Sequence, residues 1–541
     1  MASYKQQKLD PSWDAIVIGS GMGGLVAAAA LAKYGGRRVL VLERHYTAGG
    51  YTHTFHRPGY EWDVGVHYVG EMQNPNSPLR AAFDNLTGGQ LEWQPMPEVY
   101  DRIVIGDKTY DLPAGRERLR SRLKSYFPGE AQAIDCYLET LEKARKASDL
   151  FFAEKAVPGP VSKLLGGLMR APFLRWAGRT TGSALADITD NRELAGLLTA
   201  QWGDYGLPPA QSSFGIHAIV AGHYFEGASY PVGGAARIAE TITPQIESTG
   251  GQVVVSADVT EILLEQSRAV GVRMADGNEF RAPLVISDAG ARNTFERLVK
   301  DDCGTENWPV REQVRRIPSS MACLSLYVGI KQSASELGLS GTNLWVYSGP
   351  DHDAALDRFR CDPDAPFPVL FISFPSAKDP DFERRHPGHA TIEVLTAAPY
   401  DWFERWETTH WKKRGADYEQ FKQKFAARMQ RELERIVPQV AGRIDYAELS
   451  TPLSTRHFTN HERGEAYGLA ATPERFRAHA LRPQTPLRGL YLTGADAAAL
   501  GVAGTLMGGL ACASAALGRN LVSKATRRDP GQSGMLAKSA A

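Results

Sequence analysis

The chain has few cysteines, and none of them is spaced to bind a metal or to form a disulfide framework. Five cysteines are scattered over 541 residues, and no two form a C-x-x-C pair. Disulfide scaffolds and zinc sites depend on such paired spacings, and disulfides are rare in reducing compartments. We therefore expect free thiols, a cytoplasmic location and no metal ion.

The chain also lacks an excess of charge of either sign and a long uninterrupted apolar run. Lysine plus arginine and aspartate plus glutamate number 61 each, which argues against nucleic-acid binding through bulk charge. The apolar stretches 16–32 and 487–521 are broken by glycines, and no basic segment with a cleavage site precedes the first. Neither is typical of a signal peptide or a spanning helix, so we expect a soluble or peripheral protein.

A βαβ unit is predicted in the N-terminal region. Residues 13–18 are typical of a buried strand, residues 25–34 have the alanine and leucine content of a helix, and residues 38–43 form a second apolar run that ends in an acid. Three glycines at G-x-G-x-x-G spacing separate the first strand from the helix: Gly19, Gly21 and Gly24. This order of strand, glycine turn, helix, strand and acid predicts a dinucleotide-binding site.

Each part of the unit has a physical role in binding a dinucleotide. The glycines allow a tight turn, close approach of the backbone to a pyrophosphate, and close helix–strand packing. The N–H groups at the helix N-terminus bind phosphate, and Glu43 can accept hydrogen bonds from an adenosine ribose. Gly49 and Gly50 would let an extended cofactor pass against bare backbone, although the pair could also be a simple turn.

The rest of the chain is too long for one hydrophobic core, so at least two domains are expected. Short apolar runs at 252–255, 259–264 and 269–274, followed by an Asp-Gly turn, predict a small β-meander. The runs at 280–287 and 489–496 predict two returns to the nucleotide-binding sheet.

The predicted fold class is therefore α/β. A Rossmann-type domain would be assembled from three segments, and an inserted α+β substrate domain would be built from the two stretches between them; the segments are 1–70, 222–300 and 485–523, and the inserts are 71–221 and 301–484. The polar residues 524–541 are expected to form a disordered tail.

Two motifs after the βαβ unit carry a family resemblance. Residues 48–55 read A-G-G-x-x-H-T-F, and residues 63–70 read D-x-G-x-H-Y-x-G. Together with residues 19–47 they resemble the FAD-binding start of the phytoene desaturase and carotenoid isomerase superfamily, and are similar in particular to its retinol saturase family, the all-trans-retinol 13,14-reductases. Further stretches agree in order, so the resemblance spans most of the chain: His217 with 223–224 and 230–234, 285–290, and 489–509.

The resemblance implies FAD as the cofactor. The ADP half would be held by Gly19, Gly21, Gly24, Glu43, Arg44, Gly49 and Gly50, with Val259 near the adenine. The remaining cofactor-binding positions would be Gly65, Val66, His67, Asp288, Gly494, Asp496, Gly504 and Thr505. A helix beginning near Gly501 would direct its N–H groups at the flavin, where negative charge gathers on reduction.

The resemblance also implies an oxidoreductase of the CH–CH type. Flavin would exchange a hydride with one carbon of a C=C bond of a retinoid, carotenoid or other long apolar molecule, and an acid would handle the proton at the other carbon. His67, Tyr68 and Tyr467 are the proton-donor candidates; each could instead only shape the pocket. No second G-x-G-x-x-G follows a strand, so the electrons must be exchanged with substrate, a transient carrier or another protein.

Other functions stay open at this stage. Saturation is the favoured hypothesis. Desaturation and cis-trans isomerisation, which occur within the same family, need the same cofactor geometry, so the cofactor motifs do not separate the three reactions. A flavin-containing amine oxidase and a non-catalytic prenyl-lipid carrier are alternatives of other classes. Residues 157–178 mix bulky apolar residues with three basic ones, as in helices that lie in a bilayer interface, or as in a lid packed on the core.

Overall fold

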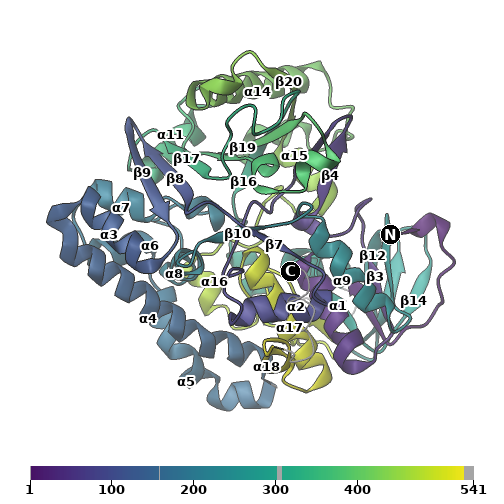
Figure 1. Ribbon diagram of the computed structural model, residues 1–541. Coiled ribbons are helices and arrows are strands. Elements are labelled where there is room, and N and C mark those ends of the chain that lie inside the picture. Colours follow the sequence, from purple (N-terminus) through teal and green to yellow (C-terminus); the bar gives the residue numbers. More distant parts are fainter. Residues whose placement is uncertain (1, 158, 301–307, 529–541) are drawn as a thin grey trace, which may run out of the picture.

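The structure is a computed structural model that describes residues 2–157, 159–300 and 308–528 (Figure 1). A parallel six-stranded sheet forms the nucleotide-binding half, in the order β1-β11-β3-β2-β15-β21. Its strands come from distant parts of the chain: β1 Ala2–Ser3, β2 Ala15–Ile18, β3 Val39–Leu42, β11 Gln252–Val255, β15 Val285–Ser287 and β21 Leu490–Leu492. Strands β2, β3 and β15 are fully buried, as expected for a parallel sheet covered on both faces.

Three helices pack together beside strand β2 of this sheet. Helix α1 (Met22–Gly35) packs on α17 (Gly501–Leu517) and on α9 (Arg237–Glu247). The alanines and glycines of α1 and α17 allow a close approach; a Cβ at Gly509 would lie 2.6 Å from the Gly23 carbonyl oxygen. The α/β class and the Rossmann-type sheet expected from the sequence are confirmed.

The strand at 252–255 was expected in the meander, and this prediction is wrong. Strand β11 pairs in parallel with β3, because its three valines are buried and suit a covered parallel sheet. The antiparallel meander contains only β12 (Val259–Glu265), β13 (Arg268–Met274) and β14 (Glu279–Arg281). The single strand expected over 280–287 is divided between β14 and β15; Pro283, which has no N–H to donate, lies in the break.

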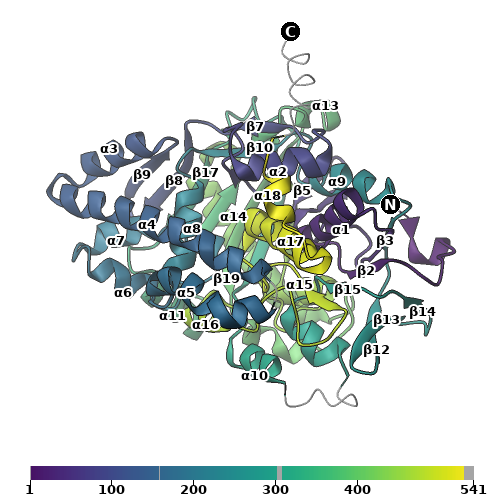
Figure 2. The same cartoon turned by 90° about the horizontal axis from the view of Figure 1, so that it is seen from below.

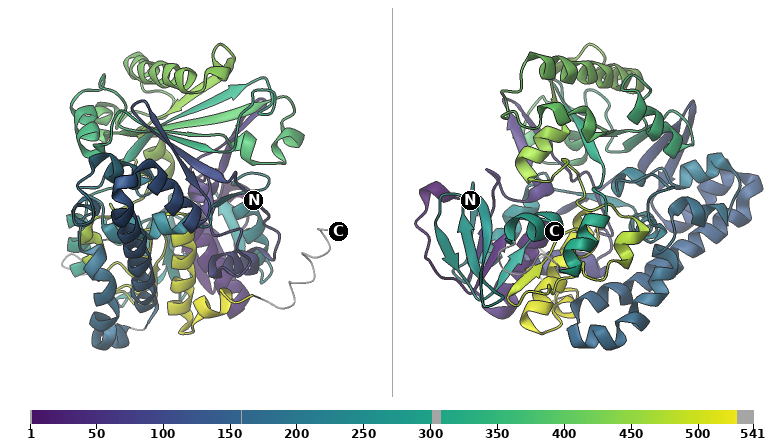
Figure 3. Two further views of the ribbon diagram at one scale, coloured as in Figure 1. Left: turned by 60° about the vertical axis from the view of Figure 1, so that its left-hand side comes forward. Right: turned by 180° about the vertical axis from the view of Figure 1, so that it is seen from behind.

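A seven-stranded mixed sheet forms the upper half of the molecule (Figures 1 and 3). Its order is β20-β16-β19-β18-β17-β8-β9, with strands β8 Val99–Ile105, β9 Lys108–Pro113, β16 Ala322–Ile330, β17 Asn343–Tyr347, β18 Leu370–Ser373, β19 Ala390–Ala398 and β20 Ile444–Ser450. Helix α14 (Ala416–Ile436) packs on its outer face. Two smaller sheets join the halves: β4 Thr54–Arg57 with β5 Tyr60–Asp63, and β6 Val69–Gly70 with β10 Ala228–Pro231 and β7 Trp93–Pro95.

Long helices cover one side of both halves (Figure 2). They include α3 Arg116–Tyr126, α4 Ala131–Ala156, α5 Gly159–Ala177 and α8 Phe214–His223. The shorter helices are α6 Thr181–Ala186, α7 Arg192–Leu198, α10 Pro309–Arg316, α11 His352–Cys361, α12 Pro375–Lys378, α13 Phe382–Arg385, α15 Pro452–Thr459, α16 Pro473–Arg477 and α18 Leu521–Ala525. Across the described ranges, no helix combines the length and apolarity needed to cross a bilayer.

Helix α2 (Pro78–Thr87) lies inside the range expected for the substrate domain, yet it packs on α1, α9 and α18. Phe83 and Leu86 are fully buried in the same core as α1, so this segment belongs with the nucleotide-binding half. Most of the tail expected to be disordered, residues 529–541, lies outside the described residues, and so does Cys303. The four described cysteines are free thiols.

Candidate active site

One large cavity runs between the two halves of the molecule. Its volume is about 1730 Å³, which exceeds the roughly 300–1,000 Å³ of a pocket for one small ligand. Nearly all the site residues expected from the sequence line it: Gly19, Gly21, Glu43, Arg44, Gly49, Gly50, Gly65, Val66, His67, Tyr68, Val259, Asp288, Tyr467, Gly494, Asp496, Gly504 and Thr505. The exception is Gly24, where a Cβ would lie 2.4 Å from the Gly19 carbonyl oxygen, so its role is close packing of helix and strand.

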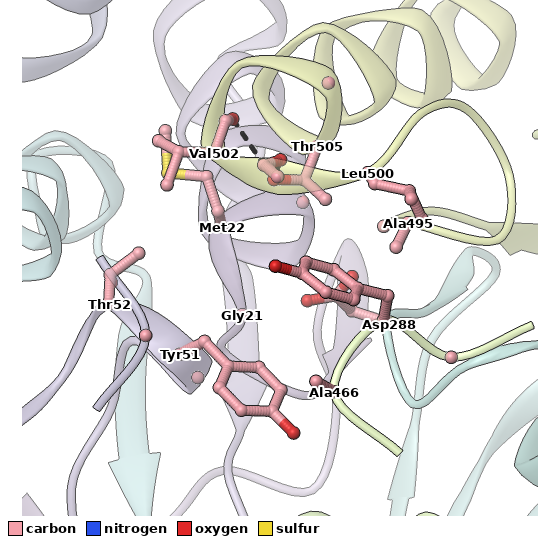
Figure 4. A pocket seen from close by; sticks show the side chains of 18 of the residues that line it. Gly21, Met22, Tyr51, Thr52, Asp288, Ala466, Ala495, Leu500, Val502 and Thr505 are labelled. Atoms are coloured by element: carbon pink, nitrogen blue, oxygen red, sulfur yellow. Dashed lines mark hydrogen bonds between the residues drawn. The ribbon is translucent and has the colours of Figure 1, made fainter. Parts of the chain in front are cut away.

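The glycine turn provides bare backbone at one end of the cavity (Figure 4). Gly19 has φ +95°, which favours glycine. A Cβ at Gly50 would lie 2.9 Å from the Cα of Gly21, so two loops approach each other without side chains. This cradle and the N-terminus of α1 fit an extended dinucleotide.

An acidic side chain, Asp288, lies against this cradle. A Cβ added at Gly21 would lie 2.5 Å from Asp288 Oδ2. Burial raises the pKa of Asp288 to about 8, although the N–H groups of Gly24 and Gly21 oppose the shift. A neutral acid at this position repels an incoming pyrophosphate less than a carboxylate would.

The acid at the end of β3 is held in a fixed orientation. Glu43 Oε2 accepts hydrogen bonds from Ser20 N at 2.8 Å and from Ser20 Oγ at 2.7 Å, and Oε1 accepts one from His45 N at 2.7 Å. Arg44 beside it donates from Nη1 to the His457 carbonyl oxygen at 2.9 Å. These three hydrogen bonds orient the Glu43 carboxylate within the protein.

The C-terminal segment forms the wall that faces the glycine turn at the same end of the cavity. Asp496 accepts hydrogen bonds from Ala291 N at 2.8 Å and from Leu469 N at 2.9 Å, so its carboxylate joins two loops that border the cavity. The first turn of α17, including Val502 and Thr505, faces the cavity (Figure 4). Its N–H groups have no intrahelical partners and favour a negative charge.

His67 lies beside a buried acid that sequence reasoning missed. Its Nδ1 is 2.8 Å from Glu393 Oε2 on β19. Burial, with Lys378 nearby, lowers the pKa of His67 to about 3, and burial raises the pKa of Glu393 to about 8. Lys378 Nζ donates to the His67 carbonyl oxygen at 2.9 Å. His67 is therefore neutral near pH 7 and fixed in place.

Tyr68 and Tyr467 both use their hydroxyl groups within the protein. Tyr68 Oη lies 3.0 Å from Asp101 Oδ2 and 2.9 Å from Asp204 Oδ2, while Tyr467 Oη donates to the Gly203 carbonyl oxygen at 3.1 Å. Asp101 and Asp204 were also missed from the sequence. The only trace of Asp101 is an acid followed by Arg102 in a strand that is otherwise apolar or aromatic, and Asp204 belongs to no motif.

Beyond these polar groups the cavity is apolar. The inner face of the seven-stranded sheet contributes Trp345, Phe371 and Leu395, and the helices contribute Phe152, Met169, Ile219 and Val220. Phe371 packs with its ring centroid 5.0 Å from that of His67. The cavity therefore joins a dinucleotide-shaped end to an apolar end, with the acidic and tyrosine groups between them.

Comparison with known proteins agrees with this arrangement. Residues 17–86 match the NAD(P)-binding Rossmann-like domain family. The all-trans-retinol 13,14-reductase of Danio rerio is 39% identical over 94% of this chain and 86% of its own length. A Danio rerio protein named an inactive all-trans-retinol 13,14-reductase is 31% identical over 96% of this chain and 88% of its own. Prolycopene isomerase 1 of an Oncidium hybrid is 28% identical over 84% of this chain and 75% of its own.

Solved structures share the fold at low sequence identity. Cyclohexylamine oxidase from Brevibacterium oxydans superposes with a TM-score of 0.59 at 18% identity, covering 96% of this chain and 100% of its own. This likeness extends through both halves of the molecule, including the inserts between the strands of the six-stranded sheet.

Proposed function

The chain belongs to the all-trans-retinol 13,14-reductase family, and from that premise we propose that it is an FAD-dependent oxidoreductase that saturates a C=C bond of a long apolar polyene. The single observation that carries the proposal is the continuous cavity, which unites a dinucleotide cradle with an apolar chamber. A retinoid is the first substrate class to test, because it is the one named for the relative at 39% identity.

The residues of the cradle would hold FAD by its ADP half. Gly21 and the start of α1 would face the pyrophosphate, Glu43 the ribose, and the first turn of α17 the flavin. When bound, FAD would supply hydride chemistry at the flavin ring. The Gly65–Val66 backbone and Tyr51, whose hydroxyl donates to the Glu465 carbonyl oxygen at 3.2 Å, would border that ring and exclude water from it.

The apolar end of the cavity would orient the polyene against the cofactor. Phe371 and Trp345 lie 4.5 Å apart between ring centroids and would pack on the flat conjugated chain. Since apolar burial is worth about 25 cal/mol per Å², such walls supply affinity without fixing the chain by charge.

The decisive experiment is an anaerobic incubation of the chemically reduced holoenzyme with all-trans-retinol, followed by mass analysis of the product. A product heavier by two hydrogens supports saturation. A product of unchanged mass and altered retention would indicate isomerisation, and a lighter product from the oxidised enzyme would indicate desaturation. Flavin bleaching by amines but by no polyene would favour an amine oxidase, and binding without any turnover would favour a carrier.

We also propose that helix α5 contacts a membrane surface. The side chains of Leu164 and Leu168 are 81% and 77% exposed, which is unusual for leucine, and Met169 on the same helix lines the cavity. Exposed apolar side chains flanked by the exposed Lys163 and Arg175 suit an interface with anionic lipid, whereas Arg170 is ion-paired with the buried Glu154. A lipid-soluble substrate could then enter from the bilayer.

Liposome co-sedimentation tests the membrane proposal. The double variant Leu164→Glu and Leu168→Glu should lose most binding to vesicles of phosphatidylcholine and phosphatidylserine. Substitution of Leu150, 44% exposed on α4, by glutamate serves as the control for an added charge elsewhere. Equal binding by wild type and the double variant would refute the membrane role and leave the enzymatic proposal intact.

A further inference from the structure

A tyrosine hydroxyl lies between two carboxyl groups at the wall of the cavity. Tyr68 Oη is within hydrogen-bond distance of both Asp101 and Asp204, at 3.0 and 2.9 Å. A hydroxyl has one proton and can donate to only one carboxylate. The second contact needs a proton from the carboxyl side, so one of the two aspartates must be a carboxylic acid.

The hydrogen bonds of Asp101 show that it is the ionised partner. Its Oδ1 accepts a hydrogen bond from Asn343 Nδ2 at 3.0 Å, and its Oδ2 accepts one from Gln201 Nε2 at 2.8 Å. Amide N–H groups can only donate, so they favour the carboxylate. Within the described ranges, the carboxyl of Asp204 has no hydrogen-bond partner except Tyr68. The proton therefore belongs to Asp204.

The electrostatics of the site agree with this proton count. Burial and the nearby charge of Asp101 raise the pKa of Asp204 to about 8. The neighbouring tyrosines have pKa values that all lie well above 10: Tyr68, Tyr100, Tyr205, Tyr224, Tyr347 and Tyr467. Burial raises the pKa of Asp101 too, but its two amide donors and the positive charge of Lys378 oppose that shift. Within the pair of aspartates, Asp204 is thus the acid that changes its proton near neutral pH; near Lys378, Asp63 and Glu393 also have pKa values of about 8, and that of Lys378 itself is lowered to about 8.

Asp204 is placed between the cofactor end and the apolar end. The carbonyl oxygen of Gly203, the residue before it, accepts a hydrogen bond from Tyr467, next to Ala466 at the cofactor end (Figure 4). On the other side, the Tyr68 ring stacks with its centroid 6.4 Å from that of Phe371 in the apolar wall. Asp204 itself lines the cavity and is partly exposed to it.

We propose that Asp204 is the catalytic proton donor of the reduction, with Tyr68 and Asp101 as positioning residues. This inference rests on the proposed function. When bound, the reduced flavin cofactor would supply a hydride, with both electrons, to one carbon of the C=C bond and would itself be oxidised. The adjacent carbon takes the Asp204 proton, so that two C–H bonds replace the π bond. Asp204 is left as a carboxylate, the Tyr68 hydroxyl donates to it, and a solvent proton restores the acid.

The test compares single-turnover reduction of all-trans-retinol by the reduced holoenzyme in wild type, Asp204→Asn and Asp204→Glu. General acid catalysis contributes about 10²–10⁴-fold, so Asp204→Asn should slow substrate-dependent flavin oxidation at least about a hundredfold, while Asp204→Glu restores part of the rate. The wild-type rate should fall as pH rises through about 8, and Asp204→Asn should lose that fall.

The matched control is Asp353→Asn. Asp353 is a half-buried aspartate outside the cavity that accepts a hydrogen bond from Ala210 N at 3.2 Å, and burial raises its pKa too. This variant should keep the wild-type rate and pH profile. Infrared spectra add a readout that needs no substrate: the wild-type minus Asp204→Asn difference spectrum at neutral pH should contain one protonated-carboxyl band, because the other protonated acids, Asp63, Asp288 and Glu393, are common to both proteins.

The outcomes separate this inference from the proposed function. If wild type reduces the polyene but Asp204→Asn keeps its rate and pH profile, or if the wild-type minus Asp204→Asn spectrum contains no protonated-carboxyl band, the assignment of Asp204 is wrong. If wild type transforms no polyene while the infrared band is present and depends on Asp204, the proposed function fails and the protonated acid stands without its catalytic role.

Discussion

Substitution of Gly50 by alanine tests whether the glycine cradle binds the cofactor. Gly50 has φ +55°, and a Cβ there would lie 2.9 Å from the backbone of Gly21. Gly36 offers a matched control, because its φ is +62° and a Cβ there would meet nothing within 4 Å. Both alanine variants adopt a left-handed conformation, which costs about 1–2 kcal/mol for a residue other than glycine.

The two variants should therefore share the conformational penalty but differ in cofactor affinity. Only Gly50→Ala also crowds the Gly21 backbone, which we propose to face the pyrophosphate. A hydrogen bond to a charged group contributes about 1.5–3 kcal/mol, and each 1.4 kcal/mol is about tenfold in Kd. Loss of one such bond predicts FAD binding at least about tenfold weaker in Gly50→Ala, with no change in Gly36→Ala.

Titration of the apoprotein with FAD, followed by flavin fluorescence, measures the affinities, and thermal unfolding of the apoproteins measures the shared conformational penalty. Equal FAD affinities for the two variants would refute the cradle, because both share the backbone penalty and only one touches Gly21.

Three further predictions concern other parts of the molecule. Burial raises the pKa of Glu393 to about 8, so its neutral form contributes stability that is fully present below the pKa of the unfolded state and is lost as pH rises through 8. The free energy of unfolding of Glu393→Gln, measured with urea, should therefore depend less steeply on pH between about 5 and 8 than that of wild type. An equal slope would contradict the raised pKa. Phe371→Asp should abolish polyene binding, measured by fluorescence quenching, while flavin content stays at the wild-type level; loss of both would mean that the wall is only structural. Trp62 is fully buried, stacks on Phe55 and donates to the Val328 carbonyl oxygen at 2.9 Å. Trp62→Ala should therefore lower the free energy of unfolding by about 3–5 kcal/mol. A loss below about 1 kcal/mol in chemical denaturation would show that the β4–β5 hairpin does not stabilise the seven-stranded sheet.

Local sequence patterns predicted the parts of the fold whose structure is locally determined. The strand before Gly19 and the alanine-rich helix after it form where the sequence indicates, and the helix that the family resemblance implies begins at Gly501. For the first two elements, apolar periodicity and glycine chemistry act over a few residues. The cavity-lining positions expected from the family motifs lie on these same elements.

The same patterns could not predict which distant elements meet. The valines of β11 suit any buried strand, and only the pairing with β3 assigns them to the parallel sheet. The three acids beside the cavity, Asp101, Asp204 and Glu393, were still harder to predict. Asp101 comes from β8, Asp204 from a turn after α7, and Glu393 from β19, and no local spacing relates them. Their proximity and shifted pKa values arise from tertiary packing alone.

The charges of that cluster also explain how an acidic wall can serve an apolar substrate. Asp63, Asp101 and Glu393 are buried near Lys378, and Asp204 joins Asp101 through Tyr68. Burial raises the pKa of all four acids, to about 8 for Asp63, Asp204 and Glu393. These three are mostly protonated at pH 7, so the ionised Asp101 and Lys378 nearly balance each other. A wall without net charge avoids the cost of holding an unpaired charge against hydrocarbon, and it still keeps a transferable proton within the cavity. Lys378→Met, which removes the positive charge that compensates the Asp101 carboxylate, should therefore weaken polyene binding more than flavin binding.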